Sequence, residues 1–112
     1  MKIIHFYRAY TKPIIPIKKQ YKENKLLGAI CAAPFALHKA GVLNKNYTCY
    51  PSCEDGIREE GYDSSTSVVK DNNVITSRGP GTAICFGLGI VKELVDNETY
   101  LGLKSGLLAD FC

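Results

Sequence analysis

The chain has 112 residues, of which 46% are hydrophobic and 22% are charged, and its formal net charge is +3. One globular domain is therefore expected, and the charge is too small and too scattered to predict nucleic-acid binding. No stretch approaches the roughly 20 apolar residues of a membrane-spanning helix, and the first residues lack the apolar core and cleavage site of a secretory signal. We expect a cytoplasmic protein with no nucleic-acid partner, no membrane partner and no cofactor.

The N-terminal part of the chain contains two prolines and is followed by a Lys-rich stretch. Residues 3–7 favour a short strand, and Pro13 and Pro16 then oppose a regular helix. The Lys-rich pattern of residues 17–24 predicts an exposed helix, whose basic side chains form a solvated face.

A short apolar run at residues 26–30 predicts a strand that is covered on both faces, as in a parallel sheet. Pro34 then suits the first turn of a helix, where a missing N–H has no consequence. That helix is expected over residues 35–40, and Gly41 provides the left-handed residue that ends it.

The middle of the chain predicts β structure around a polar loop. Residues 47–50 have strand character, and residues 52–67 read as a loop with one helical turn. Residues 67–70 and 74–76 predict a β-hairpin, because the Asn residues between them tolerate the positive φ of such turns.

The C-terminal part is apolar. Residues 82–95 predict a long helix that is mostly buried, since charge appears only at Lys92 and Glu93. Residues 100–112 are expected to pack on the body of the domain. Cys85, in the middle of the predicted helix, is expected in the core.

The five cysteines stand at positions 31, 49, 53, 85 and 112. This odd number and spacing do not resemble a compact disulfide framework, so we expect free thiols in a reducing compartment. Cys49 and Cys53 lie close in sequence but lack two further ligands nearby, and no metal site is predicted.

Cys31 stands at the point where the predicted strand turns into the predicted helix. A strand–turn–helix junction can expose one side chain, and the small residues Gly28, Ala29, Ala32 and Ala33 suit it. The helix N-terminus favours a thiolate at Cys31, and the N–H groups of Ala32 and Ala33 are candidate oxyanion donors. A small buried core cysteine is the alternative, and the local sequence does not separate the two.

Three segments carry a resemblance to a known family. Residues 28–34, Gly-Ala-Ile-Cys-Ala-Ala-Pro, resemble the cysteine motif of the ThiJ/PfpI superfamily. Residues 68–83, which include Ser-Arg-Gly-Pro-Gly, resemble the hairpin and helix start of its DJ-one-like branch, and residues 47–51 fall where that branch has a strand beside the active site. The resemblance covers about residues 18–106.

This resemblance implies an α/β fold of the flavodoxin-like sandwich type, usually a homodimer. It implies glyoxalase III-like or protein deglycase-like activity on small reactive carbonyls such as methylglyoxal. Cys31 would be the nucleophile and the oxidation sensor, and its thiolate would add to an aldehyde to form a hemithioacetal. The alternatives are a non-enzymatic redox sensor that responds to oxidants, a chaperone-like protein, or an inactive fragment.

The N-terminal segment departs from the family pattern. Family domains begin with a β-α-β segment that carries a Glu and a Gly-Gly turn, whereas only 30 residues precede Cys31 here. The first 17 contain neither an acidic residue nor a Gly-Gly pair. We therefore expect residues 1–17 to be an atypical segment and residues 18–112 to be a partial domain. A truncated or mispredicted gene product is favoured over a short paralogue, because a sheet without its leading strands exposes long edges.

Two further residues are expected beside the site. Tyr50 stands where some members have a His, and a tyrosine donates hydrogen bonds but is a poor base at neutral pH. The guanidinium of Arg78 is expected to hold the adjoining loop or a dimer contact, with a plain surface role as the alternative. His38, on the helix after Cys31, is expected to face away from the site.

Overall fold

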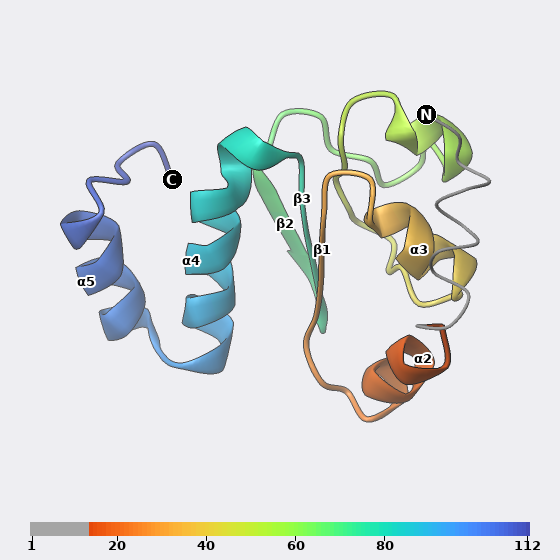
Figure 1. The fold of residues 1–112 in the computed structure, drawn as a ribbon, viewed down its shortest axis with the longest axis horizontal. Helices are drawn as coiled ribbons and strands as arrows, with labels where there is room; N and C mark the ends of the chain where they lie inside the picture. The colour runs from red at the N-terminus through yellow and green to blue at the C-terminus, as the bar shows by residue number, and fades with distance from the viewer. Residues whose placement is uncertain (1–13) are drawn as a thin grey trace.

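The computed structural model describes residues 14–112, which form a small sheet flanked by helices (Figure 1). The strands lie in the order β1-β3-β2, with β1 parallel and β2 antiparallel to β3. No helix in this part of the chain has the length and apolar character needed to cross a membrane. The elements are, in chain order, α2 (Ile14–Lys22), β1 (Leu27–Ile30), α3 (Pro34–Lys39), the 3-10 turn η1 (Cys53–Gly56), β2 (Val68–Asp71), β3 (Val74–Ser77), the 3-10 turn η2 (Pro80–Thr82), α4 (Ala83–Leu94) and α5 (Asn97–Gly106).

The helices are divided between the two faces of the sheet. Figure 1 shows α2 and α3 on one side and α4 on the other, with α5 running back along the outer side of α4. This arrangement confirms the predicted α/β class, because parallel pairing requires helices that cover the sheet.

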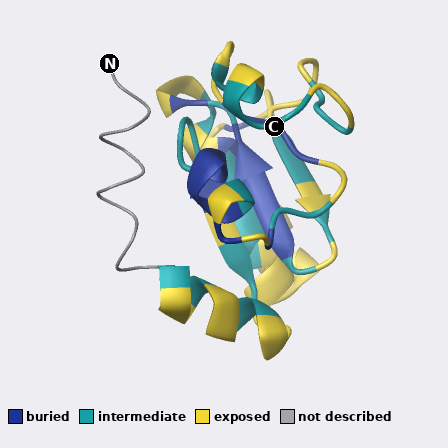
Figure 2. Cartoon of the chain, turned by 90° about the vertical axis from the view of Figure 1, so that its right-hand side faces the viewer, coloured by how far each residue is buried: buried dark blue, intermediate teal, exposed yellow. Residues whose placement is uncertain are grey.

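Most of the core lies between the sheet and the helices α2 and α3 (Figure 2). Ala29 of β1 and Val74 of β3 pack there against Leu37 of α3, and Ile14 and Ile17 of α2 close the cluster from outside. The boundary expected between residues 17 and 18 therefore falls within one helix, and it stays a prediction.

On the opposite face, α4 approaches the sheet closely because a glycine faces it. A Cβ at Gly89 would lie 2.9 Å from the Cδ1 atom of Ile75. That distance is shorter than real Cβ contacts allow, so a larger residue at this position would require the Ile75 side chain or α4 to shift.

The predicted strand, turn and helix around Cys31 are confirmed, and the helix before them begins earlier than expected. α2 starts at Ile14 because Pro16 lies within its first turn, where an N–H has no helical partner. The strand expected at residues 3–7 lies outside the described residues. Gly41 adopts φ 74° just after α3, as its predicted role requires.

The hairpin and the loop are confirmed, whereas the strand expected at residues 47–50 is not. Asn72 carries the positive φ of the hairpin turn, and η1 supplies the single helical turn in the loop. Residues 47–50 make only one isolated parallel bridge, between Tyr47 and Tyr62. Residues 47–49 are nevertheless fully buried, and the Thr48 N–H donates to the Thr76 Oγ1 at 2.9 Å instead of joining a ladder.

Two expectations for the C-terminal part are wrong. Within α4 only Cys85 and Leu88 are buried, whereas the side chain of Leu94 is 67% exposed, because α5 covers a single stripe of the helix. The five cysteines are not all free either, since Cys85 forms a disulfide with Cys112. The chain turns back through α5 and brings the two Cα atoms within 5.3 Å, a separation that suits a disulfide.

Candidate functional site

Cys31 occupies a strained backbone position between β1 and α3. Its φ is 66°, in the left-handed region that non-glycine residues seldom adopt. The Cys31 N–H donates to the Ser77 carbonyl at 3.1 Å, and the Cys31 carbonyl accepts from the Tyr50 N–H at 2.9 Å. These bonds fix the backbone on both sides of the side chain. Strained residues of this kind cost about 1–3 kcal/mol and gather at functional sites.

The N–H groups of Ala32 and Ala33, which are expected to donate to an oxyanion, differ in their hydrogen bonding. The Ala33 N–H donates to the Ile30 carbonyl at 3.1 Å and so closes the turn. The Ala32 N–H makes no hydrogen bond among residues 14–112. The Ala32 N–H is therefore available to donate to an oxyanion, whereas the Ala33 N–H would have to divide its hydrogen bond between the oxyanion and the Ile30 carbonyl.

Tyr50 lies beside Cys31 through its backbone and points its ring outward. The side chain is 48% exposed, and a Cβ at Gly79 would lie 3.3 Å from the ring. Tyr50 and the segment from Arg78 to Thr82 line an open hollow of about 290 Å³. Thr82 shapes that segment, because its Oγ1 accepts from the Gly79 N–H at 3.1 Å.

Arg78 uses its guanidinium to hold the loop that precedes β2. It donates to the Cys49 carbonyl at 3.2 Å and to the Tyr62 hydroxyl at 2.8 Å, and also to the Ser64 carbonyl. The planar fork of arginine serves several acceptors at once. Among the roles expected for Arg78, the structure therefore displays the one that holds the loop.

Three cysteines are free thiols, and they differ in burial. Cys31 and Cys53 are half-buried, whereas Cys49 is fully buried. Burial raises the pKa of Cys49 to about 12. The pKa of Cys53 is also raised, by burial first and then by the nearby negative charges of Cys31, Glu54 and Asp55. Sequence reasoning did not place Cys53 beside Cys31, because only the folded loop brings them together.

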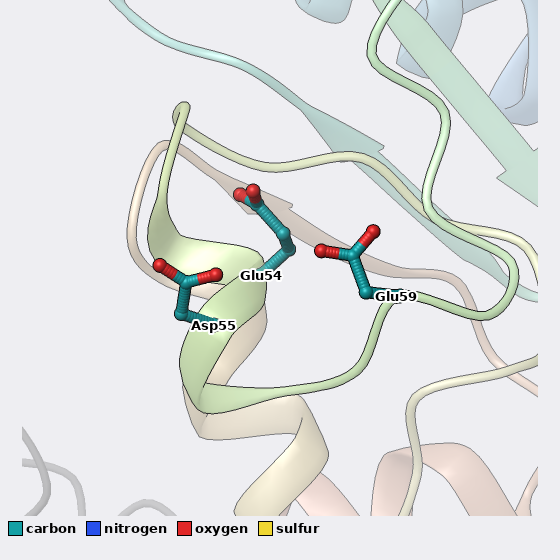
Figure 3. Close-up of side chains that lie close together, drawn as sticks. All are labelled: Glu54, Asp55 and Glu59. Carbon is teal, nitrogen blue, oxygen red and sulfur yellow. The ribbon is translucent and has the colours of Figure 1, made fainter.

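Three carboxylates gather just after Cys53, in and beyond η1 (Figure 3). Oxygens of Glu54, Asp55 and Glu59 lie within 4.8 Å of one another. The Oε1 atom of Glu54 is buried without a hydrogen-bond partner among the described residues, and the other two side chains are exposed. Sequence reasoning read this stretch only as polar loop. Exposed acidic groups commonly cluster without an ion, so we assign no metal to them.

His38 takes no part in this arrangement. It lies near the end of α3, and burial lowers its pKa, helped by the positive charges of Lys39 and Arg58. We therefore leave His38 out of the candidate site.

The sequence matches the DJ-1/PfpI family over residues 5–93. It is 42% identical to the protein dj-1beta of Drosophila melanogaster over 97 residues, which are 85% of this chain and 52% of that protein. It is 38% identical to the glutathione-independent glyoxalase DJ-1 of Schizosaccharomyces pombe, over 87% of this chain and 53% of the relative. The chain thus spans about half the length of the curated relatives that it matches.

Solved structures show the same fold. The crystal structure of Drosophila melanogaster DJ-1beta superposes with a TM-score of 0.79, over 85% of this chain and 52% of that one, at 42% identity. The oxidized DJ-1 of Toxoplasma gondii gives a TM-score of 0.78 over the same shares at 29% identity. The architecture is therefore a partial flavodoxin-like sandwich, as the sequence predicts.

Proposed function

The chain belongs to the DJ-1/PfpI family, and from this membership we propose that its Cys31 thiolate adds to small reactive carbonyl compounds such as methylglyoxal. Two relatives are named glutathione-independent glyoxalases, from Schizosaccharomyces pombe and Caenorhabditis elegans. The observation that carries the proposal is the left-handed backbone of Cys31 at the junction of β1 and α3. This geometry holds a half-buried thiol at a turn, where a small molecule can reach it.

The proposed chemistry begins with the sulfur of Cys31. The thiolate attacks the aldehyde carbon, a C–S bond forms, and the carbonyl electron pair moves to oxygen. The Ala32 N–H, which no other group occupies among the described residues, donates to this oxyanion. Protonation of the oxygen then gives a hemithioacetal on Cys31.

Turnover to a hydroxy acid requires further proton transfers. A positioned acid or base contributes about 10²–10⁴ in rate to such steps. We also propose a cytoplasmic location and a homodimer, as the family resemblance implies.

Methylglyoxal consumption without glutathione tests this proposal. The purified chain should consume methylglyoxal and carry its mass on the tryptic peptide of residues 26–39, and Cys31→Ser should lose both signals. Circular dichroism spectra and thermal melts must match between the two proteins, so that the loss reflects the missing sulfur. Equal consumption by the folded chain and by Cys31→Ser would overturn the proposal.

A further inference from the structure

We propose that Cys53 is the resolving cysteine for Cys31, so that peroxide converts this pair into an intramolecular disulfide. The inference rests on the reactive Cys31 of the proposed function, and it adds a reversible oxidised state to the same site. It also assigns a role to a thiol that the carbonyl chemistry does not use.

The reaction proceeds in two balanced steps. The Cys31 thiolate attacks one oxygen of hydrogen peroxide, the O–O bond breaks, and a sulfenic acid and hydroxide form. The Cys53 sulfur then attacks the sulfenic sulfur, an S–S bond forms, and the hydroxyl leaves as water with the proton of Cys53. Two thiols and one peroxide thus give one disulfide and two waters.

The backbone ties the two cysteines together through Tyr50. The Tyr50 N–H donates to the Cys31 carbonyl at 2.9 Å, and the Tyr50 carbonyl accepts from the Cys53 N–H at 2.9 Å. Two consecutive hydrogen bonds therefore hold the start of η1 against the junction that carries Cys31. This connection does not depend on any side-chain conformation.

A tight turn directs the chain after Tyr50 back toward the junction of β1 and α3. Residues 50–53 form a type II turn, with Pro51 in its second position and Ser52 in its third. Ser52 adopts φ 79° and ψ −14°, values that such a turn requires and that usually select glycine. The fold thus accepts a strained serine where the turn brings the backbone of Cys53 back toward the junction.

The electrostatics of Cys53 set the order of the two steps. Burial raises the pKa of Cys53, and the negative charge of a Cys31 thiolate raises it further. Cys53 is therefore held as a thiol, so that Cys31 meets the oxidant first. Conversion of Cys31 to a neutral sulfenic acid removes that one contribution, while burial still raises the pKa of Cys53.

The other cysteines are poorer candidates. Cys49 is fully buried with a pKa of about 12, and its carbonyl is held by Arg78 at 3.2 Å. A thiol in that condition supplies almost no thiolate. Cys85 and Cys112 are already joined to each other. Among the described residues, Cys53 is therefore the thiol that the fold presents to an oxidised Cys31.

The test uses two equivalents of hydrogen peroxide per chain, rapid alkylation of the remaining thiols, and tryptic mass spectrometry. The unaltered protein should yield the peptides of residues 26–39 and 46–58 joined to each other, with the mass of two hydrogens lost. Cys53→Ser should lose the cross-link and instead gain the mass of two oxygens on Cys31. Because Cys49 lies in the same tryptic peptide, the matched control is Cys49→Ala, which should keep the cross-link.

The outcomes separate this inference from the proposed function. If Cys31 gains two oxygens equally in the unaltered protein and in Cys53→Ser, Cys31 is reactive but Cys53 does not resolve it, and the inference fails alone. A cross-link that persists in Cys53→Ser and disappears in Cys49→Ala also overturns it. If Cys31 stays unoxidised in both folded proteins while other thiols react, the proposed function fails together with the inference.

Discussion

Gly61 supports the segment that lies beside Cys31, and replacing it with alanine should be severely destabilising. Gly61 adopts φ 82°, and an added Cβ would lie 1.8 Å from the Lys45 carbonyl oxygen. That atom is backbone and cannot rotate away. The Gly61 carbonyl also accepts from the Tyr47 N–H at 3.0 Å, so a displaced Gly61 breaks the bridge that seats residues 47–50.

A second glycine separates the two sources of this cost. Gly41 has a similar φ of 74°, but an added Cβ would meet nothing within 4 Å. Gly41→Ala should therefore introduce only the left-handed strain, which lowers the free energy of unfolding by about 1–2 kcal/mol. Restriction of the unfolded chain offsets about 0.4–1 kcal/mol of this loss. Gly61→Ala bears the same terms and adds a steric cost of about 1–3 kcal/mol or more.

Urea unfolding followed by circular dichroism measures both variants. Gly61→Ala should have a free energy of unfolding lower than that of Gly41→Ala by about 1–3 kcal/mol. Equal losses in the two variants would refute the reasoning, because they would show that the backbone near Lys45 moves aside without cost.

Three further changes test other parts of the structure. Cys112→Ser removes the disulfide to Cys85, which closes 27 residues, and should lower the free energy of unfolding by up to about 3.5 kcal/mol; an unchanged urea midpoint would contradict it. Arg78→Lys should lower the free energy of unfolding by about 1–2 kcal/mol, since an ammonium cannot serve three separated acceptors. An unchanged free energy of unfolding would show that the loop before β2 does not depend on these hydrogen bonds. Hydrogen bonds from Thr66 and Ser65 lower the pKa of Asp63 to about 2 from 3.8. The stabilisation by Asp63 is therefore present above pH 3.8 and lost as the pH falls through about 2. Urea unfolding across this range should show that the difference in free energy of unfolding between the unaltered chain and Asp63→Asn disappears as the pH falls. A difference that stays constant would contradict the assignment.

The sequence predicts the site best where the structure is local. An apolar run, Pro34 and Gly41 together define the strand, turn and helix around Cys31, because each acts within a few residues. The hairpin follows for the same reason, since Asn72 supplies its own turn conformation. The family resemblance then adds what local patterns cannot, namely that these pieces belong to one partial flavodoxin-like sandwich.

Features that depend on distant contacts escape sequence reasoning. The disulfide between Cys85 and Cys112 exists only because α5 reverses the chain. The exposure of much of α4 likewise depends on which of its stripes α5 covers. The proximity of Cys53 to Cys31 depends on a turn whose third residue, Ser52, is not the expected glycine. The disulfide and the exposed stripes of α4 have no periodic or local signature in the sequence.

The central claim is that Cys31 is the reactive thiol of this protein, and competitive alkylation tests it most directly. The folded chain is exposed to limiting iodoacetamide at neutral pH, and the modified fraction of each free cysteine is followed by mass spectrometry. Cys31 should be modified about tenfold or more faster than Cys49 and Cys53, whose raised pKa values keep them protonated. Equal rates at the three sites, or faster modification of Cys53, would contradict the claim.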